Sequence, residues 1–338
     1  MPFLAWPPMN TCRQIAARTV APGKGVLAAD ESITTMSARL VTAGVESTAE
    51  NRRTYRELLA TTPDLAAGVS GIIFCDETLN QRFADGRPFP EAVLALGILP
   101  GIKVDTGARD CPGLPGEKIT EGLDGLADRL AGYAGMGAAF AKWRAVFRIA
   151  DDAPTAAGIR ANAHALARYA AACQEAGIVP IVEPEVLMDG PHPLQRCAEV
   201  TARVHAAVIA ELAAFSVDPA GMVLKPNMVI EGTEYPAQSP PEEVATATTD
   251  MLRALPDDLA GVAFLSGGQA PERATANLAA MQDHRTPWPL TFSFGRALVE
   301  PALFAWAGHP ERVADGQAAL AHRVTANADA VRRRLQPL

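Results

Sequence analysis

KWRAVF (142–147) and VPIVEPEV (179–186) are two short apolar runs, and GIRANAHALARYAAACQEAG (158–177) lies between them. The runs are rich in aromatic and β-branched residues, as strands are, whereas the longer stretch carries alanine and arginine in the amphipathic pattern of a helix. Parallel strands need a long crossover connection, which is usually a helix. The whole stretch therefore predicts two neighbouring parallel strands joined by a helix.

The same alternation continues on both sides of this unit. Eight strand-like runs are separated mostly by helical patterns, which favours a parallel sheet with helices outside it. Eight units in 338 residues point to an α/β protein built as a closed (β/α)8 barrel, a TIM barrel. An open doubly wound sheet is the alternative, but no G-x-G-x-x-G follows the first run. The predicted strands are GVLAAD (25–30), GIIF (71–74), GIKVD (101–105), KWRAVF (142–147), VPIVEPEV (179–186), GMVLKP (221–226), GVAFLSG (261–267) and PLTFSFG (289–295).

The chain is expected to form a single domain over residues 1–338, because no stretch is rich enough in Pro, Gly or Ser to divide it. Residues 1–24 precede the first strand, and we expect a helix at about 10–20 and then a turn at Pro22-Gly23. GTEYPAQSPPEE (232–243) is expected to be a long loop after the sixth strand.

The composition argues against several classes of protein. Apolar residues make up 49% and charged residues 20%, which favours a sizeable core over disorder. The net charge of −8 argues against a nucleic-acid surface, and no apolar stretch approaches the roughly 20 residues that span a membrane. MPFLAWPPMN lacks the basic flank of a signal peptide, and five cysteines without a C-x-x-C pair fit reduced thiols. The six histidines show no metal-ligand spacing, so we expect no metal site. The preceding features together predict a cytoplasmic protein.

Three of the five lysines lie inside or at the end of predicted strands, at Lys103, Lys142 and Lys225. Lysine is almost never fully buried unless it is paired. In an apolar setting near other cations its ammonium loses proton affinity, and the neutral amine becomes a nucleophile. The alternative is that each stem runs along its strand and the charged end reaches solvent. Three such lysines together favour amine catalysis.

Polar residues gather at the C-terminal ends of the predicted strands, where (β/α)8 enzymes carry their active sites. Residues two apart on a strand share a face, so Lys142 and Arg144 are expected to point the same way, as are Glu183 and Glu185. A buried structural ion network is the alternative, although such a network need not run round the whole barrel. The residues in question are Asp30, Lys103, Lys142, Arg144, Glu183, Glu185, Lys225, Ser266 and Arg296.

These residues carry five positive and three negative charges, so the expected pocket is cationic on an acidic protein. Such a pocket suits an anionic ligand. Gly267 and Gly268 follow the seventh strand and Gly295 follows the eighth, where backbone N–H groups and a helix N-terminus can bind a phosphate. Ordinary turn glycines are the alternative interpretation.

At this point the motifs resemble those of a known family, the class I (Schiff-base) fructose-1,6-bisphosphate aldolases. The resemblance runs in one order from about residue 20 to about residue 330. It implies a metal-independent enzyme without a cofactor, which cleaves fructose 1,6-bisphosphate reversibly to dihydroxyacetone phosphate and glyceraldehyde 3-phosphate in glycolysis and gluconeogenesis, as a homotetramer. The matching segments are APGKGVLAADES, ENRRTYRELL, DGRPFP, GIKVD, EGLDGL, FAKWR, GIVPIVEPE, VLKPNM, FLSGGQ and TFSFGRAL.

The resemblance also implies a role for each matching position. Lys225 would form the imine with the C2 carbonyl, and Glu183 would act as acid and base around it. Lys142 would keep Lys225 uncharged, Asp30 would take the C4 hydroxyl proton, and Glu185 would support the lysines. The C1 phosphate would be held by Ser266, Gly267, Gly295 and Arg296, and the far phosphate or the C4–C6 half by Ser32, Arg39, Lys103 and Arg144.

The chain departs from the animal pattern at several positions. It ends in RRRLQPL, and its last tyrosine is Tyr235, whereas the animal enzymes end in a tyrosine that assists proton exchange. Another group or water is therefore expected to protonate the enamine. Thr106 and Ala38 stand where that pattern has lysines, which predicts weaker binding of the far phosphate or tolerance of fructose 1-phosphate. Smaller departures are Thr35 for serine and Phe294 for tyrosine.

Two other functions remain open. One is a Schiff-base aldolase or transaldolase that prefers another phosphorylated ketose. The other is a sugar-phosphate-binding or scaffolding protein without turnover.

Overall fold

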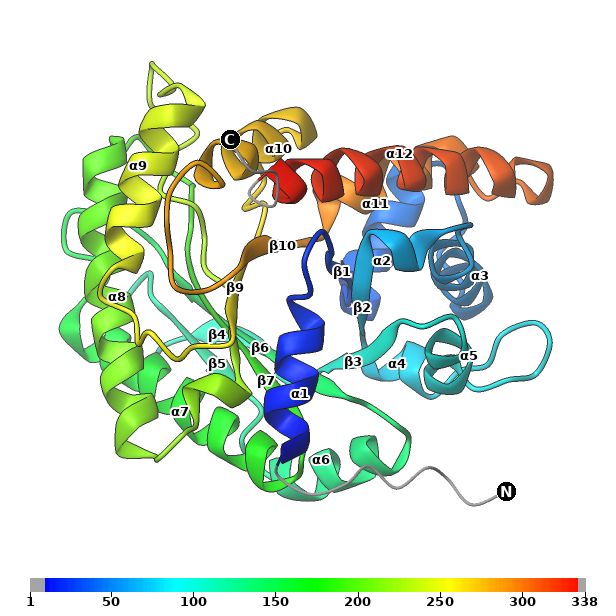
Figure 1. The fold of residues 1–338 in the computed structure, drawn as a ribbon, viewed down its shortest axis with the longest axis horizontal. Coiled ribbons are helices and arrows are strands. Elements are labelled where there is room, and N and C mark those ends of the chain that lie inside the picture. The colour runs from blue at the N-terminus through cyan, green and yellow to red at the C-terminus, as the bar shows by residue number, and fades with distance from the viewer. Residues whose placement is uncertain (1–9, 334–338) are drawn as a thin grey trace.

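A computed structural model describes residues 10–333 of the chain, and within them eight parallel strands close into a barrel in the order β1-β10-β9-β8-β7-β6-β3-β2 (Figure 1). The predicted (β/α)8 barrel is therefore confirmed. The expectations for residues 1–9 and for the last five residues lie outside the described part. The barrel strands are β1 (Gly25–Ala29), β2 (Val69–Phe74), β3 (Leu99–Lys103), β6 (Phe140–Phe147), β7 (Val179–Val186), β8 (Val223–Leu224), β9 (Gly261–Phe264) and β10 (Leu290–Phe294).

Helices surround the barrel and connect successive strands (Figure 1). Within the described residues, none combines the length and apolar character that a membrane crossing needs. The helices are α1 (Asn10–Thr19), α2 (Ile33–Thr42), α3 (Ala49–Ala60), α4 (Asp76–Leu79), α5 (Phe89–Ala95), α6 (Leu126–Gly135), α7 (Ala156–Glu175), α8 (Leu194–Ala214), α9 (Pro241–Leu252), α10 (Pro271–Met281), α11 (Arg296–Trp306) and α12 (Val313–Arg332), with short 3-10 turns η1 (Leu65–Ala67), η2 (Pro219–Gly221) and η3 (Pro310–Arg312).

The strand bounds differ from the prediction most at β8. The predicted run 221–226 contributes only Val223–Leu224 to the barrel, because η2 ends at Gly221 and Pro226 has no N–H for a sheet. A second difference is an antiparallel hairpin between β3 and α6, made of β4 (Gly107–Asp110) and β5 (Lys118–Glu121), which the sequence did not predict. The predicted loop 232–243 ends earlier, since α9 begins at Pro241, a favourable first position for proline.

Alternate residues of the strands fill the inside of the barrel. Phe140, Ile181 and Val223 belong to an inner cluster, whereas their sequence neighbours pack outward against the helices. Helix α1 adds Ile15 and Ala16 to the same inner cluster, so it lies across the N-terminal end of the barrel. Both faces of each strand are thus covered, which explains why the strands read as continuous apolar runs.

The ring of Phe140 occupies the middle of the barrel. An added Cβ on Gly101 would lie 2.1 Å from this ring, and one on Gly71 would lie 2.6 Å from it. Glycine on the two neighbouring strands therefore makes room for one large side chain, in the manner of small and large residues that alternate in barrel layers. This apolar layer is the floor on which the polar residues of the mouth stand.

Candidate active site

On β6 and just after β8, the next inward-facing residue beyond the apolar floor is a lysine. Lys142 comes two residues after Phe140, and Lys225 comes two after Val223. Both point into a cavity of about 410 Å³ at the mouth of the barrel. All thirteen predicted site residues line it, namely Asp30, Ser32, Arg39, Lys103, Lys142, Arg144, Glu183, Glu185, Lys225, Ser266, Gly267, Gly295 and Arg296.

Four of these residues form a continuous chain of ion pairs at the bottom of the cavity. Lys142 Nζ lies 2.7 Å from Asp30 Oδ2 and 3.2 Å from Glu183 Oε2. The other oxygen of Glu183 lies 3.2 Å from Lys225 Nζ. All four side chains are buried, so these lysines do not reach bulk solvent, and the interpretation of free lysine ends at the surface is wrong for Lys142 and Lys225.

The ionisation of this chain follows from burial opposed by neighbouring charge. Burial raises the pKa of Asp30, but Lys142 and Lys225 outweigh it and lower that pKa to about 2. Burial likewise raises the pKa of Glu183, and the same two lysines bring it below its ordinary value. Burial lowers the pKa of Lys142, but Asp30 and Glu183 raise this pKa by more than burial lowers it, so the net shift is upward. At neutral pH a cationic Lys142 therefore sits between two carboxylates.

Three more cations of the cavity are each paired at 2.5 Å with a carboxylate. Arg144 Nε contacts Glu185 Oε2. Lys103 Nζ contacts Asp105 Oδ1. The third pair joins Arg39 and Glu31.

The cavity is therefore closer to neutral than the sequence predicted. Among the described residues, six cations and five carboxylates line it, instead of five and three. Glu31 and Asp105 are lining residues that were not predicted from the sequence. Asp105 could have been found, because it lies two residues after Lys103 and so shares its face. Glu31 gave no such signal, since it lies beyond the end of β1 in the turn to α2.

The opposite side of the cavity has a different character. Arg296 is the first residue of α11 and has no carboxylate within ion-pair distance in the described part of the chain. Gly267 and Gly268 have φ values of 59° and 85°, in the left-handed region that favours glycine. A Cβ on Gly268 would lie 2.8 Å from Arg296 Nη2, so the guanidinium packs closely on this turn. An unpaired guanidinium beside a glycine turn and a helix N-terminus forms a suitable phosphate site.

The positions that depart from the animal pattern lie in different places. Ser32 caps the N-terminus of α2 by accepting a hydrogen bond from the Thr35 N–H, and both residues line the cavity. Ala38 and Thr106 are exposed and outside its lining, and Phe294 is buried in the core between barrel and helices.

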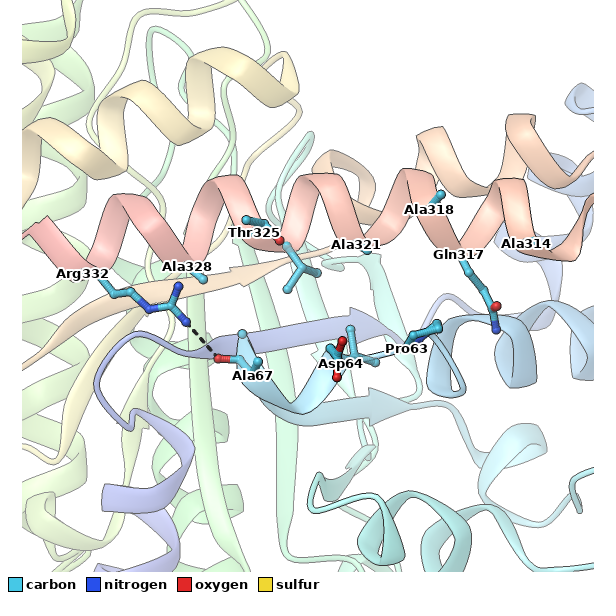
Figure 2. A pocket seen from close by; sticks show the side chains of 13 residues that line it. Pro63, Asp64, Ala67, Ala314, Gln317, Ala318, Ala321, Thr325, Ala328 and Arg332 are labelled. Atoms are coloured by element: carbon cyan, nitrogen blue, oxygen red, sulfur yellow. Dashed lines mark hydrogen bonds between the residues drawn. The ribbon is translucent and has the colours of Figure 1, made fainter.

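A second cavity, of about 460 Å³, lies between α12 and the turn at η1 (Figure 2). Its lining is mostly small, with Ala314, Ala318, Ala321 and Ala328 on one helix face. The guanidinium of Arg332 spans one end and donates a hydrogen bond to the Ala67 carbonyl. Its size is similar to that of the mouth cavity, but its lining carries no cluster of buried ionised groups among the described residues.

Neither a metal-binding cluster nor a disulfide is present in the described residues. Between residues 10 and 333, no group of three or more His, Cys, Asp or Glu side chains is arranged to hold a metal ion. The five cysteines are free thiols.

Comparison with known proteins identifies the family of the chain. A family model named "Glycolytic" and described as "Fructose-bisphosphate aldolase class-I" matches residues 11–337. The chain belongs to this family. A class I aldolase named "Probable fructose-bisphosphate aldolase class 1" from Xanthomonas axonopodis pv. citri is 51% identical over 296 residues, which cover 87% of this chain and 89% of that protein.

Relatives of the aldolase family also occur among plants and solved structures. "Fructose-bisphosphate aldolase 6, cytosolic" of Arabidopsis thaliana is 49% identical over 318 residues, covering 93% of this chain and 88% of that protein. A crystal structure of fructose-bisphosphate aldolase from Plasmodium falciparum, in complex with TRAP and a small-molecule inhibitor, superimposes with a TM-score of 0.94 at 42% identity. The match covers 98% of this chain and 96% of that chain.

Proposed function

We propose that this aldolase cleaves fructose 1,6-bisphosphate reversibly into dihydroxyacetone phosphate and glyceraldehyde 3-phosphate through a Schiff base on Lys225. The observation that carries the proposal is the buried chain Asp30–Lys142–Glu183–Lys225, with contacts of 2.7, 3.2 and 3.2 Å at the bottom of one cavity. Imine formation and retro-aldol cleavage require a nucleophilic amine and acid–base groups. Here these would be one amine, two carboxylates and a neighbouring ammonium.

Imine formation is assigned to Lys225 and Glu183. The amine of Lys225 adds to the C2 carbonyl, and the oxygen takes a proton from solvent to give the carbinolamine, which then loses its hydroxyl as water to leave a protonated imine. Glu183 Oε1 lies 3.2 Å from Lys225 Nζ, so it can take a proton from the attacking amine and return it to the departing hydroxyl. The ammonium of Lys142 lies 3.2 Å from the other oxygen of Glu183, where it can assist proton movement near C2.

Cleavage is assigned to Asp30. It accepts the proton of the C4 hydroxyl, the C3–C4 bond breaks, and its electron pair moves into the iminium to form an enamine. Glyceraldehyde 3-phosphate leaves. Protonation of the enamine at C3 and hydrolysis of the imine release dihydroxyacetone phosphate and restore the amine. Lys142 lowers the pKa of Asp30, so a weaker contact with Lys142 would make this carboxylate a stronger base.

The two phosphates are assigned to opposite sides of the cavity. The C1 phosphate is placed at the turn that contains Gly267, with Ser266, Gly295 and the unpaired Arg296. The far phosphate is placed among Ser32, Arg39, Lys103 and Arg144. Holding both ends fixes C2 over the amine and C4 near Asp30, which supplies the positioning part of catalysis.

Borohydride trapping tests the proposal. The purified protein is incubated with dihydroxyacetone phosphate and borohydride, and covalent adduct is read by mass, alongside turnover of fructose 1,6-bisphosphate with a chelator present. We expect adduct on Lys225 and chelator-resistant turnover. K225A should lose both the adduct and the turnover. K118A, which removes an exposed lysine from the β4–β5 hairpin, should keep both. Adduct that survives in K225A would assign the nucleophile to another lysine, and binding without turnover would favour a sugar-phosphate-binding protein.

Fructose 1-phosphate is a second candidate substrate. The observation in its favour is that Arg39, Lys103 and Arg144 are each paired with a carboxylate at 2.5 Å, whereas Arg296 has no carboxylate partner among residues 10–333. Binding free energy is thus expected to be concentrated on the C1 phosphate. A comparison of kcat/KM for the two sugars decides which is preferred.

The assembly and location follow the same family. We propose a homotetramer in the cytoplasm, formed from one domain that spans residues 1–338. The cytosolic designation of the Arabidopsis relative and the free cysteines support the location. Sedimentation of the purified protein tests the assembly.

A further inference from the structure

The carboxylate of Glu31 is held from both sides by arginines of two different helices. Its Oε1 lies 2.5 Å from Arg39 Nη1 on α2, and its Oε2 lies 2.7 Å from Arg56 Nη2 on α3. The Glu31 and Arg56 side chains are 9% and 2% exposed, whereas that of Arg39 is 25% exposed. Glu31 and Arg39 line the mouth cavity, and Arg56 does not.

This arrangement places a negative charge where the proposed function needs to bind a phosphate. An unneutralised carboxylate in a poorly solvated site would repel the phosphate strongly. Arg39 cannot neutralise Glu31 and bind a phosphate fully at the same time. Arg56 lies behind Glu31, so it can offset the carboxylate charge whether or not Arg39 is engaged with substrate.

We propose that Arg56 is a positioning residue that sets the specificity of the far-phosphate subsite: it retains and neutralises Glu31 so that Arg39 can turn to the phosphate. This inference rests on the proposed function. It predicts that Arg56 matters for a sugar with a phosphate at C6 and hardly matters for one without it.

The surroundings of Arg56 support this role. A second nitrogen, Nη1, lies 3.0 Å from Met36 Sδ on α2, so the guanidinium bridges the two helices. Its neighbour Tyr55 stacks on Trp306 at 5.7 Å and donates a hydrogen bond to the Val299 carbonyl, which fixes this turn of α3 against α11. Arg56 is thus anchored independently of substrate.

The test compares kcat and KM of R56M for fructose 1,6-bisphosphate and fructose 1-phosphate. We expect the kcat/KM for the bisphosphate to fall about tenfold, mainly through KM, and that for the monophosphate to change less than twofold. The matched control is R52M. Arg52 lies one turn earlier on α3 and makes a similar pair with Glu77 at 2.7 Å, away from the cavity. R52M should lower the melting temperature and leave the ratio of the two kcat/KM values unchanged.

A second substitution separates charge from packing. In R56M/E31Q the bare carboxylate is gone, so the bisphosphate KM should return toward the wild-type value even though the buried pair is still missing. If R56M does not fold, E31Q alone decides. It removes the negative charge and should leave the KM for the bisphosphate equal or lower. A KM that rises for the bisphosphate and not for the monophosphate would overturn the inference.

The remaining outcomes are equally decisive. An equal loss of both kcat/KM values in R56M, a double variant no better than R56M, or a shift of the ratio in R52M would each show that Arg56 only stabilises the fold. A wild-type protein that cleaves neither sugar would instead refute the proposed function.

Discussion

Lys142 Nζ lies 2.7 Å from the Asp30 carboxylate, and both side chains are buried at the bottom of the cavity. The proposed base is therefore already bound to a cation in the protein without substrate. This pairing explains why its pKa is about 2 although burial acts in the opposite direction.

Asp30→Asn separates the cleavage step from imine formation. We expect kcat for the bisphosphate to fall by roughly 10²–10⁴-fold, because the amide cannot accept the C4 hydroxyl proton. Trapping of dihydroxyacetone phosphate by borohydride should persist, since that step depends on Glu183 and Lys225. If D30N loses trapping together with cleavage, Asp30 is needed to assemble the site and is not specifically the base.

His205 on α8 predicts a pH dependence of stability. It is 3% exposed, neither ring nitrogen has a hydrogen-bond partner among the described residues, and burial lowers its pKa from 6.5 to about 4. Between pH 6.5 and pH 4 the unfolded chain therefore binds a proton that the folded protein does not. The free energy of unfolding should fall by roughly 3 kcal/mol across this range and stop falling from this cause below about pH 4.

His205→Leu should remove that part of the pH dependence. The measurement is urea denaturation of both proteins at several pH values between 7.5 and 4. A difference in unfolding free energy that does not vary with pH would show that His205 is not the group that titrates.

Gly101→Ala tests the packing of the barrel floor. The new Cβ would lie 2.1 Å from the Phe140 ring, so we expect a loss of about 1–3 kcal/mol in the free energy of unfolding. Gly132→Ala is the matched control. Gly132 lies in the exposed part of α6 with nothing within 4 Å of its added Cβ, so this change should stabilise by about 0.5–1 kcal/mol. Equal effects of the two substitutions would contradict the packing argument.

Gly268→Ala tests the C1 phosphate site. The methyl group would meet Arg296 Nη2 at 2.8 Å, so we expect a higher KM for both fructose 1,6-bisphosphate and fructose 1-phosphate. Gly86→Ala is the control for backbone strain, because Gly86 has a similar φ of 88° and open space around it. G86A should lose stability by about 1–2 kcal/mol with an unchanged KM. An unchanged KM in G268A would place the phosphate elsewhere.

The sequence predicted the barrel and the charged residues near the strand ends because both depend on local patterns, whereas Ser32 and Arg39 were expected only from the family resemblance. Alternation on one strand was sufficient to place Lys142 and Arg144 on the same inner face. The partners of these cations were harder to predict. The contact of Arg56 with Glu31 joins residues 25 positions apart on different elements, and it depends on how α3 packs, which no local pattern encodes.

Two parts of the fold were also beyond local reasoning. The β4–β5 hairpin consists of four-residue strands that are partly exposed and carry little apolar periodicity. The β8 strand is short because Pro226, the residue after Lys225, has no N–H to donate. The register of the neighbouring strands β7 and β9 decides how many residues pair. Tertiary packing decides both cases.

The spacing of Phe140 and Lys142, repeated at Val223 and Lys225, ties the hydrocarbon floor and the reactive groups to one strand register. A single inserted or deleted residue within β6 would exchange the two faces of everything after it, sending the ammonium among the outer helices and Trp143 toward the substrate. An insertion or deletion within these strands therefore keeps each side chain on its face only when it adds or removes an even number of residues. We expect loops, and not the barrel strands, to absorb the insertions that distinguish members of this family.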